Sequence, residues 1–340
     1  MKHFIILAGL LLTGMTMLHA QDSAATRTLS MAEYEKARTL AVTDLDNDTY
    51  VKFDNIYILD KSGFGKPYFI TGDDGMKKRI DLYKLVLKEG RADLGTLIYY
   101  TTEKGKRYTA CMPSYKTDGK VWAKYFEDIH AIDKEEPFFV LKLSYVLSKE
   151  LGFQLYRAAA TGQGKDLSKE RESGTYGNDI CFPGDMQVKM ADGSLRELSR
   201  IHAGDRVLTV DPATRETAMV TVKELAVHEA KNYAITSLML LSADERQTAA
   251  GMQVRLSSRV LRATPNHPMA TPAGHKKIGE LLEGDKVLCL DEKTGSYAGY
   301  TVWQKTESAG GVQPVYNIVA DGGNTFIMND VMVLQKEVRK

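Results

Sequence analysis

Residues 204–208 read Gly-Asp-Arg-Val-Leu, and residues 284–288 read Gly-Asp-Lys-Val-Leu. The match continues without a gap across residues 204–222 and 284–302, where about half of the positions are identical. Such self-similarity indicates an internal duplication. Each copy alternates short apolar runs with Gly-Asp turns, which is typical of short antiparallel strands. We therefore predict an all-β domain built from two related halves around a pseudo-twofold axis.

A change in composition marks where this domain begins. Residues 158–180 are rich in Gly, Ser, Thr, Lys and Glu, which predicts a flexible linker. We expect the β domain to span residues 181–335, with a tail at residues 336–340. A chain of 340 residues favours two folded units, and residues 21–157 provide the other one.

The segment before the linker reads as a small α+β domain. A short helix is expected at residues 32–40, and the strand-like runs are residues 50–59, 68–71, 96–102 and 107–112. Asp133, followed by Glu136 and Pro137, predicts the capped start of a buried helix that stops before Gly152. The domain shows no catalytic cluster, phosphate loop or nucleic-acid signature, so its function is not predicted.

The first twenty residues resemble a targeting segment rather than part of a fold. Lys2 and His3 precede an apolar run at residues 4–12, and small-residue cleavage is expected after Ala20. These features predict a cleaved secretory signal peptide and export to the periplasm, the cell surface or the medium. The run is too short to span a bilayer, and no membrane span is expected in the mature chain. A net charge of +1 gives no support to nucleic-acid binding.

The chain has 3 cysteines, so at least one thiol is free of intrachain pairing. Cys111 and Cys289 are interpreted as core residues. Cys181 differs, because it stands at the end of the linker and its own amide nitrogen belongs to the bond it could attack. Addition of its thiolate to the carbonyl carbon of Ile180 would convert the amide into a thioester. A thiol pKa of ~8.5 requires a base, the leaving amine requires a proton, and the oxyanion requires donors.

The segment Thr264-Pro265-Asn266-His267-Pro268 supplies candidates for this chemistry. His267 can deliver a proton to the scissile nitrogen, and imidazole suits a group that both takes and gives protons. The Thr264 hydroxyl can reach the same bond or fix the imidazole. The two prolines stiffen the turn, so both side chains can be aimed from one loop.

In their order along the chain, these motifs resemble the Hedgehog/intein (Hint) family. The residues that carry the resemblance are Cys181-Phe182-Pro183-Gly184, then residues 204–208, then Thr264-x-x-His267-Pro268, and finally residues 315–318, 324–326 and 331–333. The resemblance covers residues 181–335. It implies a flat, disk-like, all-β fold and an autocatalytic N-to-S acyl shift at Cys181, with no cofactor and no required partner.

Departures from the family pattern predict which part of the reaction remains. Inteins usually end in His-Asn followed by Cys, Ser or Thr, whereas this chain reads Leu334-Gln335-Lys336. Gln335 and Asn317 are the candidates for any C-terminal step, and efficient splicing is not expected. Only residues 336–340 follow in this sequence, so transfer to a sterol, as in Hedgehog proteins, is not expected. We therefore expect one cut between Ile180 and Cys181, with water or a small nucleophile as the acyl acceptor, and release of the N-terminal domain.

Two other interpretations compete with self-cleavage. A degenerate Hint domain would no longer cleave and would serve as a structural or binding module, leaving the exported chain intact. A cysteine peptidase acting in trans through Cys181 and His267 would require a substrate cleft. No His, Cys or Asp spacing predicts a metal site.

Overall fold

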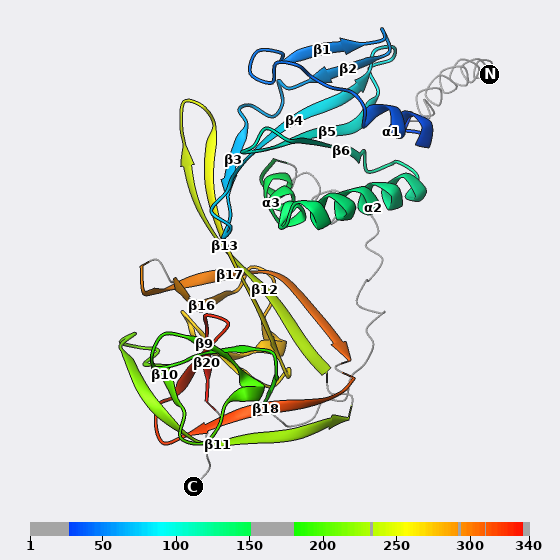
Figure 1. Ribbon diagram of the computed structural model, residues 1–340. Coiled ribbons are helices and arrows are strands. Elements are labelled where there is room, and N and C mark those ends of the chain that lie inside the picture. The colour runs from blue at the N-terminus through cyan, green and yellow to red at the C-terminus, as the bar shows by residue number, and fades with distance from the viewer. Residues whose placement is uncertain (1–26, 151–179, 232–233, 292–293, 310, 336–340) are drawn as a thin grey trace, which may run out of the picture. The chain divides into compact units, whose positions relative to one another are not determined.

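The computed structural model describes residues 27–150, 180–231, 234–291, 294–309 and 311–335 (Figure 1). The predicted signal peptide with Ala20, most of the linker and the tail lie outside the described residues. The chain divides into two units that interleave along the sequence. Unit 1 contains residues 1–70, 77–153 and 247–253, and unit 2 contains residues 71–76, 154–246 and 254–340.

Unit 1 is an antiparallel sheet with helices on one face (Figure 1). Its helices are α1 (Met31–Ala37), α2 (Gly119–Glu135) and α3 (Phe139–Glu150). Its strands pair in the order β1 (Tyr50–Phe53), β2 (Tyr57–Asp60), β4 (Lys77–Leu87), β5 (Asp93–Thr102) and β6 (Arg107–Pro113). Strand β3 (Tyr68–Thr71) precedes β4. Tyr99 and Tyr100 are fully buried, which places them in the core of the α+β unit.

Two details of unit 1 correct the sequence analysis. The run expected as one strand at residues 50–59 is two strands, because Asp54 and Asn55 turn the chain with φ angles of 49° and 54°. Short polar side chains tolerate this left-handed region. Asp133 does not begin a helix either, since it lies inside α2. Its carboxylate accepts the Val140 N–H of α3 at 2.9 Å, so it caps the following helix.

Unit 2 is mostly β. Its strands are β7 (Phe182–Pro183), β8 (Gln187–Lys189), β9 (Leu195–Glu197), β10 (Arg206–Val210), β11 (Thr217–Lys231), β12 (Ala234–Gln247), β13 (Met252–Ala263), β14 (Pro268–Thr271), β15 (Gly274–Lys277), β16 (Lys286–Asp291), β17 (Ser296–Ala309), β18 (Val312–Ala320), β19 (Thr325–Met328) and β20 (Val331–Leu334). The only helical segments described between residues 180 and 335 are two short 3₁₀ turns, Leu198–Arg200 and Ile278–Glu280. The predicted β class is confirmed.

The sequence duplication is also a structural one. Arg206 of β10 pairs with Thr221 of β11, and in the second copy Lys286 of β16 pairs with Thr301 of β17. The Gly204 N–H donates to the Val222 carbonyl at 2.8 Å, while its counterpart Gly284 donates to Val302 at 2.9 Å. The long strands then cross over, because β11 pairs with β18 and β17 pairs with β12. The long strand of each copy therefore pairs with a strand that lies outside its own copy.

In each of the two Gly-Asp turns, the aspartate carboxylate accepts hydrogen bonds from a backbone N–H and from a basic side chain. Asp285 accepts the Leu282 N–H at 2.9 Å and Lys276 Nζ at 2.7 Å. Lys276 and the Leu282 amide hold the pKa of Asp285 below its usual range. Asp205 repeats the arrangement with the His202 N–H at 2.8 Å and Arg196 at 2.7 Å. Both carboxylates therefore stabilise the turns in which they lie.

Cys111 and Cys289 both lie in apolar cores. Each thiol is fully buried. Burial raises the pKa of Cys111 to about 12 and also raises the pKa of Cys289. These thiols are therefore protonated at neutral pH, which agrees with the structural role predicted for them.

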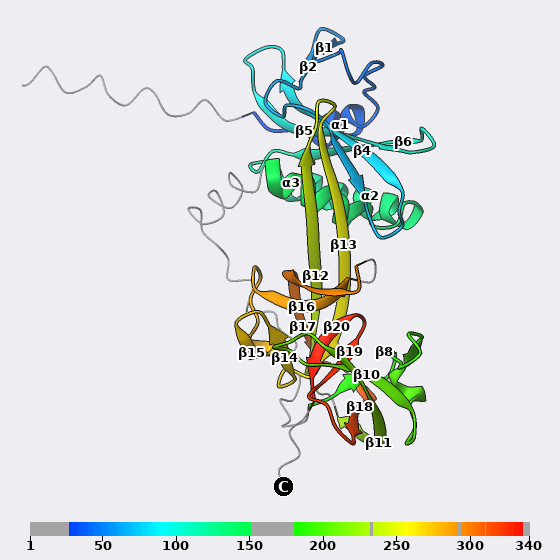
Figure 2. The same cartoon turned by 90° about the vertical axis from the view of Figure 1, so that its left-hand side faces the viewer.

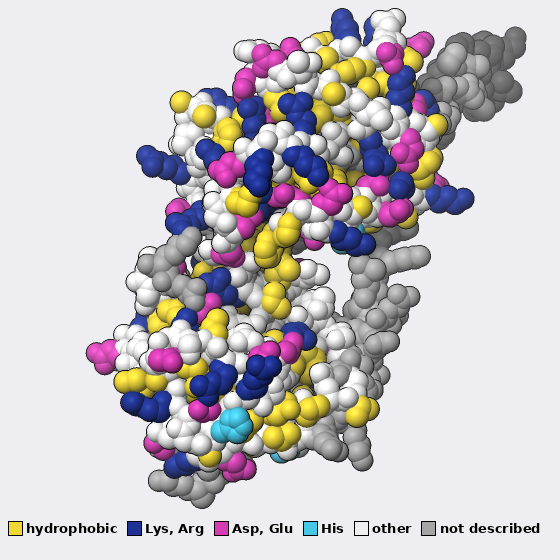
Figure 3. Space-filling model, in the orientation of Figure 1, with side chains coloured by type: hydrophobic (Ala, Val, Ile, Leu, Met, Phe, Trp, Pro, Cys, Tyr) yellow, Lys and Arg dark blue, Asp and Glu magenta, His cyan; other side chains and the backbone are white. Residues whose placement is uncertain are grey.

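The surface carries both signs of charge. Lys and Arg side chains are interspersed with Asp and Glu on the face shown in Figure 3, in keeping with the small net charge of the chain. Within the described residues, no helix combines the length and the apolar character that a bilayer span needs.

We predict that Gly284→Ala destabilises unit 2 by about 1–2 kcal/mol, because Gly284 has a φ of 94° that L-residues avoid. A Cβ there would meet no atom within 4 Å, so backbone strain alone is tested. Urea unfolding followed by Trp303 fluorescence in a Trp122→Phe background measures the effect. Gly322→Ala is the control, since its φ is ordinary and its Cβ would make a normal contact at 3.9 Å with Val220. Equal stability of the Gly284 and Gly322 variants would contradict the prediction.

Candidate functional site

Cys181 lies immediately before β7, at the start of unit 2. Its neighbours Phe182 and Pro183 pair with Tyr316 and Val315 of β18. The Cys181 residue is 1% exposed, and it packs in a small apolar cluster with Ile235 and Val315. A short strand pair and a buried side chain therefore fix the position of the candidate nucleophile. Ile180, on the other side of the candidate scissile bond, is partly exposed.

Thr264 holds the backbone of Cys181 on both sides of its Cα atom. The Cys181 N–H donates to Thr264 Oγ1 at 3.0 Å, and the Thr264 N–H donates to the Cys181 carbonyl at 2.9 Å. The Thr264 hydroxyl also donates to that carbonyl at 3.3 Å. Thr264 is 2% exposed, so these bonds form away from water. The nitrogen bonded by Thr264 Oγ1 is the nitrogen of the Ile180–Cys181 peptide bond.

His267 is brought to the same place by a tight turn. The His267 N–H donates to the Thr264 carbonyl at 2.9 Å, and the Ile278 N–H donates to the His267 carbonyl at 2.8 Å. The imidazole ring lies against the Phe182 ring, with centroids 4.0 Å apart and an interplanar angle of 52°. Since Phe182 directly follows Cys181, this contact places the imidazole next to the start of the unit. The local fold thus brings together the three residues predicted from sequence.

The imidazole of His267 is neutral at ordinary pH. Burial lowers its pKa from 6.5 to about 3, and the backbone of Leu334 opposes this shift. The residue is 1% exposed, and neither ring nitrogen reaches a described side-chain or backbone partner with full hydrogen-bond geometry. A pKa of about 3 makes the neutral ring a weak proton acceptor, which departs from the imidazole that both takes and gives protons expected from the sequence. Once protonated, it would be a strong acid.

The candidates for a C-terminal step lie on or near β18 and β20. The Gln335 N–H donates to the Asn324 carbonyl at 2.8 Å. The Gln335 side-chain amide is assigned with its nitrogen donating to the Gly323 carbonyl at 3.0 Å and its oxygen accepting the Ala320 N–H at 3.3 Å. Asn317 is 5% exposed and pairs with Ala226 across the β11–β18 ladder. The Gln335 amide is thus engaged by backbone atoms.

The sequence did not predict four residues that contact the site. Phe182 packs against His267, Ile235 and Val315 pack around Cys181, and the backbone of Leu334 lies near the imidazole. The signal for Phe182 was its position directly after the cysteine. The contacts of Ile235 and Val315 come from strand pairing across distant parts of the chain, and a backbone contact leaves no residue signature.

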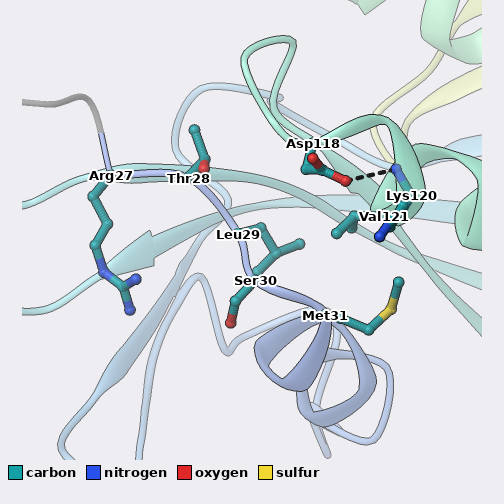
Figure 4. Close-up of a pocket in the computed structure, with 8 residues that line it drawn as sticks. All are labelled: Arg27, Thr28, Leu29, Ser30, Met31, Asp118, Lys120 and Val121. Carbon is teal, nitrogen blue, oxygen red and sulfur yellow. Dashed lines mark hydrogen bonds between the residues drawn. The ribbon is translucent and has the colours of Figure 1, made fainter.

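Two hollows of the surface lie elsewhere. The larger, of about 660 Å³, belongs to unit 1 and is lined by residues 27–31 with Asp118, Lys120 and Val121 (Figure 4). The second, of about 350 Å³, is lined by Met190, Ala191, Asp192, Arg196, Asp205, Arg206 and Met219. Neither includes Cys181, Thr264 or His267. A peptidase acting in trans would need a cleft at its nucleophile, so the hollows give that interpretation no support. Among the described residues, no group of three His, Cys, Asp or Glu side chains could hold a metal ion.

Comparisons with known proteins find likeness only among solved structures, since no protein-family model and no curated protein matches the chain. A bacterial intein-like domain from Clostridium thermocellum is similar at 27% identity, covering 46% of this chain and 99% of that chain with a TM-score of 0.35. A DnaB intein from Synechocystis sp. PCC 6803 is similar at 18% identity, covering 46% and 99% with a TM-score of 0.35.

An intein from a hyperthermophile is similar at 16% identity, covering 46% of this chain and 100% of that chain with a TM-score of 0.36. All three TM-scores are low. The description of unit 2 therefore rests on its own duplicated strands, their crossover and the contacts around Cys181.

We predict that His267 makes the protein less stable as the pH falls below 6.5. The unfolded chain takes up a proton there while the native imidazole, with a pKa of about 3, does not. Stability is then lost at up to about 1.4 kcal/mol per pH unit, or about 2 kcal/mol by pH 5. Urea unfolding at pH 7, 6 and 5 should show this loss in the parent but not in His267→Gln. The exposed His275→Gln serves as the control. Identical pH dependence in all three proteins would mean that His267 titrates normally.

Proposed function

We propose that unit 2 cleaves its own chain between Ile180 and Cys181 by an N-to-S acyl shift. The observation that carries this proposal is the 3.0 Å hydrogen bond from the Cys181 N–H to Thr264 Oγ1. That bond engages the nitrogen that must leave the carbonyl carbon of Ile180. The same turn presents a neutral, buried imidazole beside Phe182. The proposal assigns Cys181 as the nucleophile, Thr264 as the hydroxyl that orients the scissile nitrogen, and His267 as the proton carrier.

The reaction moves an acyl group and one proton. Cys181 Sγ forms a bond to the carbonyl carbon of Ile180, and the thiol proton passes to the His267 imidazole. The resulting tetrahedral oxyanion collapses as the bond between that carbon and the Cys181 nitrogen breaks. His267 returns the proton to the leaving nitrogen, which becomes a free amine. The low pKa of His267 makes its protonated form a strong donor for that step.

The thioester then needs an acceptor. Water attack gives a carboxylate at Ile180 and restores the Cys181 thiol, and a small thiol would give a new thioester. Transfer to a downstream segment is not part of the proposal. The Gln335 amide is bonded to the backbone at Gly323 and Ala320, which opposes its attack on its own carbonyl carbon. We include in the proposal that the chain is exported and that the cut breaks the covalent link between its N-terminal domain and the Hint-like unit.

A second candidate function is a structural module that has lost the reaction. One observation favours it: Cys181 is 1% exposed and packs against Ile235 and Val315, where an external acceptor has little access. In this case the polar contacts of Thr264 would serve only to anchor the start of the unit. The two candidates differ in whether a purified chain cuts itself.

We predict that purified residues 21–340 yield a fragment ending at Ile180, and that added thiol speeds its appearance. Intact-mass spectrometry should detect that fragment as a thiol adduct, because a small thiol can exchange into the thioester. Cys181→Ala should stay intact, since it lacks the sulfur that forms the bond. Cys111→Ala removes a different buried thiol and should cut like the parent.

Each result assigns one function. A cut in Cys181→Ala would identify an outside protease. An uncut parent with thiol present, folded by circular dichroism, would overturn the proposal and leave the structural module.

We predict that Thr264→Val slows thiol-induced cleavage by roughly tenfold to a hundredfold. Valine keeps the shape of the side chain but leaves the buried Cys181 N–H without its acceptor, a loss of about 1–3 kcal/mol. Thr264→Ser retains the hydroxyl and should cut at close to the parent rate. Initial rates from gel densitometry separate the three proteins. Equal rates for the valine and serine variants would show that the hydroxyl does not assist the reaction.

A further inference from the structure

Each unit of the protein contains residues from both sides of the proposed cut. The cut would give an N-terminal fragment ending at Ile180 and a C-terminal fragment beginning at Cys181. Residues 247–253 of the C-terminal fragment belong to unit 1, and residues 71–76 of the N-terminal fragment belong to unit 2. The ends of the fragments therefore do not coincide with the limits of the folded units.

Residues 247–253 are the tip of the hairpin formed by β12 and β13 (Figure 2). The tip is braced by its own turn, in which Thr248 Oγ1 donates to the Gly251 carbonyl at 2.7 Å. Two bonds then join it to unit 1. Lys66 Nζ donates to the Ala249 carbonyl at 2.6 Å, and the Met252 N–H donates to the Pro67 carbonyl at 3.1 Å. Both bonds are accepted by backbone carbonyls, and the bond from Met252 is formed by backbone atoms alone.

Gly251 shows how closely the tip approaches unit 1. A Cβ atom on Gly251 would lie 2.2 Å from the Pro67 carbonyl oxygen and 3.2 Å from the Phe69 ring. Gly251 also has a φ of 151° and is buried. Only glycine allows two backbones to come this close. The tip is therefore packed into unit 1 rather than resting on its surface.

A reciprocal contact lies in unit 2. The Asp73 carboxylate accepts the Ser258 N–H at 2.8 Å and the Ser258 hydroxyl at 3.1 Å. Arg259 lies 3.9 Å from Asp73 and forms a 3.1 Å ion pair with Asp330. The Arg259 side chain is 15% exposed, so the cluster is partly shielded from water. Asp73 belongs to the N-terminal fragment, and its partners belong to the C-terminal fragment.

These contacts do not depend on the Ile180–Cys181 peptide bond. Every one of them is a hydrogen bond, an ion pair or a packing contact within a folded unit. Breaking a bond at the start of β7 removes no donor, acceptor or apolar side chain from them. The fragments are thus joined through residues 66–76 on one chain and residues 249–259 on the other.

We propose that the N-terminal fragment stays bound to the C-terminal fragment after the cut, clasped by the tip of the β12–β13 hairpin and by Asp73. The proposal rests on the proposed self-cleavage and changes its outcome. The product is a two-chain protein, and separation of the chains requires the hairpin tip to leave unit 1. The C-terminal fragment therefore binds residues 66–76 of the N-terminal fragment, to which it was covalently joined before the cut.

The test uses the full chain with a specific protease site inserted between Gly174 and Thr175, so that it does not depend on self-cleavage. After complete cutting under native conditions, size-exclusion chromatography should show the two fragments eluting together. Hydrogen exchange at residues 247–253 should stay as slow as in the uncut chain. Separate elution of the cut parent, or rapid exchange at the tip after cutting, would overturn the proposal. Failure of thiol-induced cleavage would count against the proposed function alone.

Matched variants locate the clasp. Asp73→Ala combined with Gly251→Leu should raise the dissociation constant of the cut fragments by about tenfold or more, because charge-assisted bonds and close packing are lost together. Asp60→Ala makes the same charge change elsewhere in the N-terminal fragment, where the carboxylate accepts the Ser62 N–H at 2.9 Å, and should dissociate like the parent. Circular dichroism of the uncut variants checks that both units remain folded. Unchanged binding in a folded double variant would contradict the assignment of the clasp.

Discussion

The Cys181 N–H and the Cys181 carbonyl are both bonded to Thr264, a residue far along the chain. These bonds orient the peptide bond at the start of unit 2 and leave its nitrogen facing a hydroxyl rather than water. Everything else in the site depends on this constraint. The turn that begins at Thr264 carries His267 against Phe182, and Phe182 is placed by its pairing with Tyr316 of β18. Loss of the Thr264 contact would release the backbone at Cys181, and the contacts of Phe182 and His267 depend on the position of that backbone.

The chemistry that this constraint permits depends on the dryness of the site. A neutral imidazole in an apolar setting cannot hold a positive charge for long, so a proton it takes is readily given up. That property suits the step in which the leaving nitrogen receives a proton. The same burial limits the access of water or another external nucleophile to Cys181. Under the proposed mechanism, the thioester would therefore persist until a small nucleophile reaches it.

The repeat and the three site residues could be predicted because each leaves a mark in the sequence. The Gly-Asp turns recur with the same spacing, and Cys181 stands at the end of a polar linker. Other features depend on contacts that no single segment records. The position of Asp133 inside α2 follows from its bond to Val140 in the next helix. The close approach of Gly251 to Pro67 was equally invisible, because a glycine in a polar turn looks like any other.

The crossover of the long strands has a consequence for when the site can exist during synthesis. Phe182 finds its partner in β18, and His267 lies near the backbone of Leu334 at the end of β20. A ribosome must therefore release almost the whole unit before Cys181 is held in place. A nascent chain that ends soon after Cys181 carries the thiol without the residues that surround it in the folded unit. Under the proposed self-cleavage, the Ile180–Cys181 bond would therefore stay intact until translation has passed residue 334, and the order of the strands would place the cut after folding.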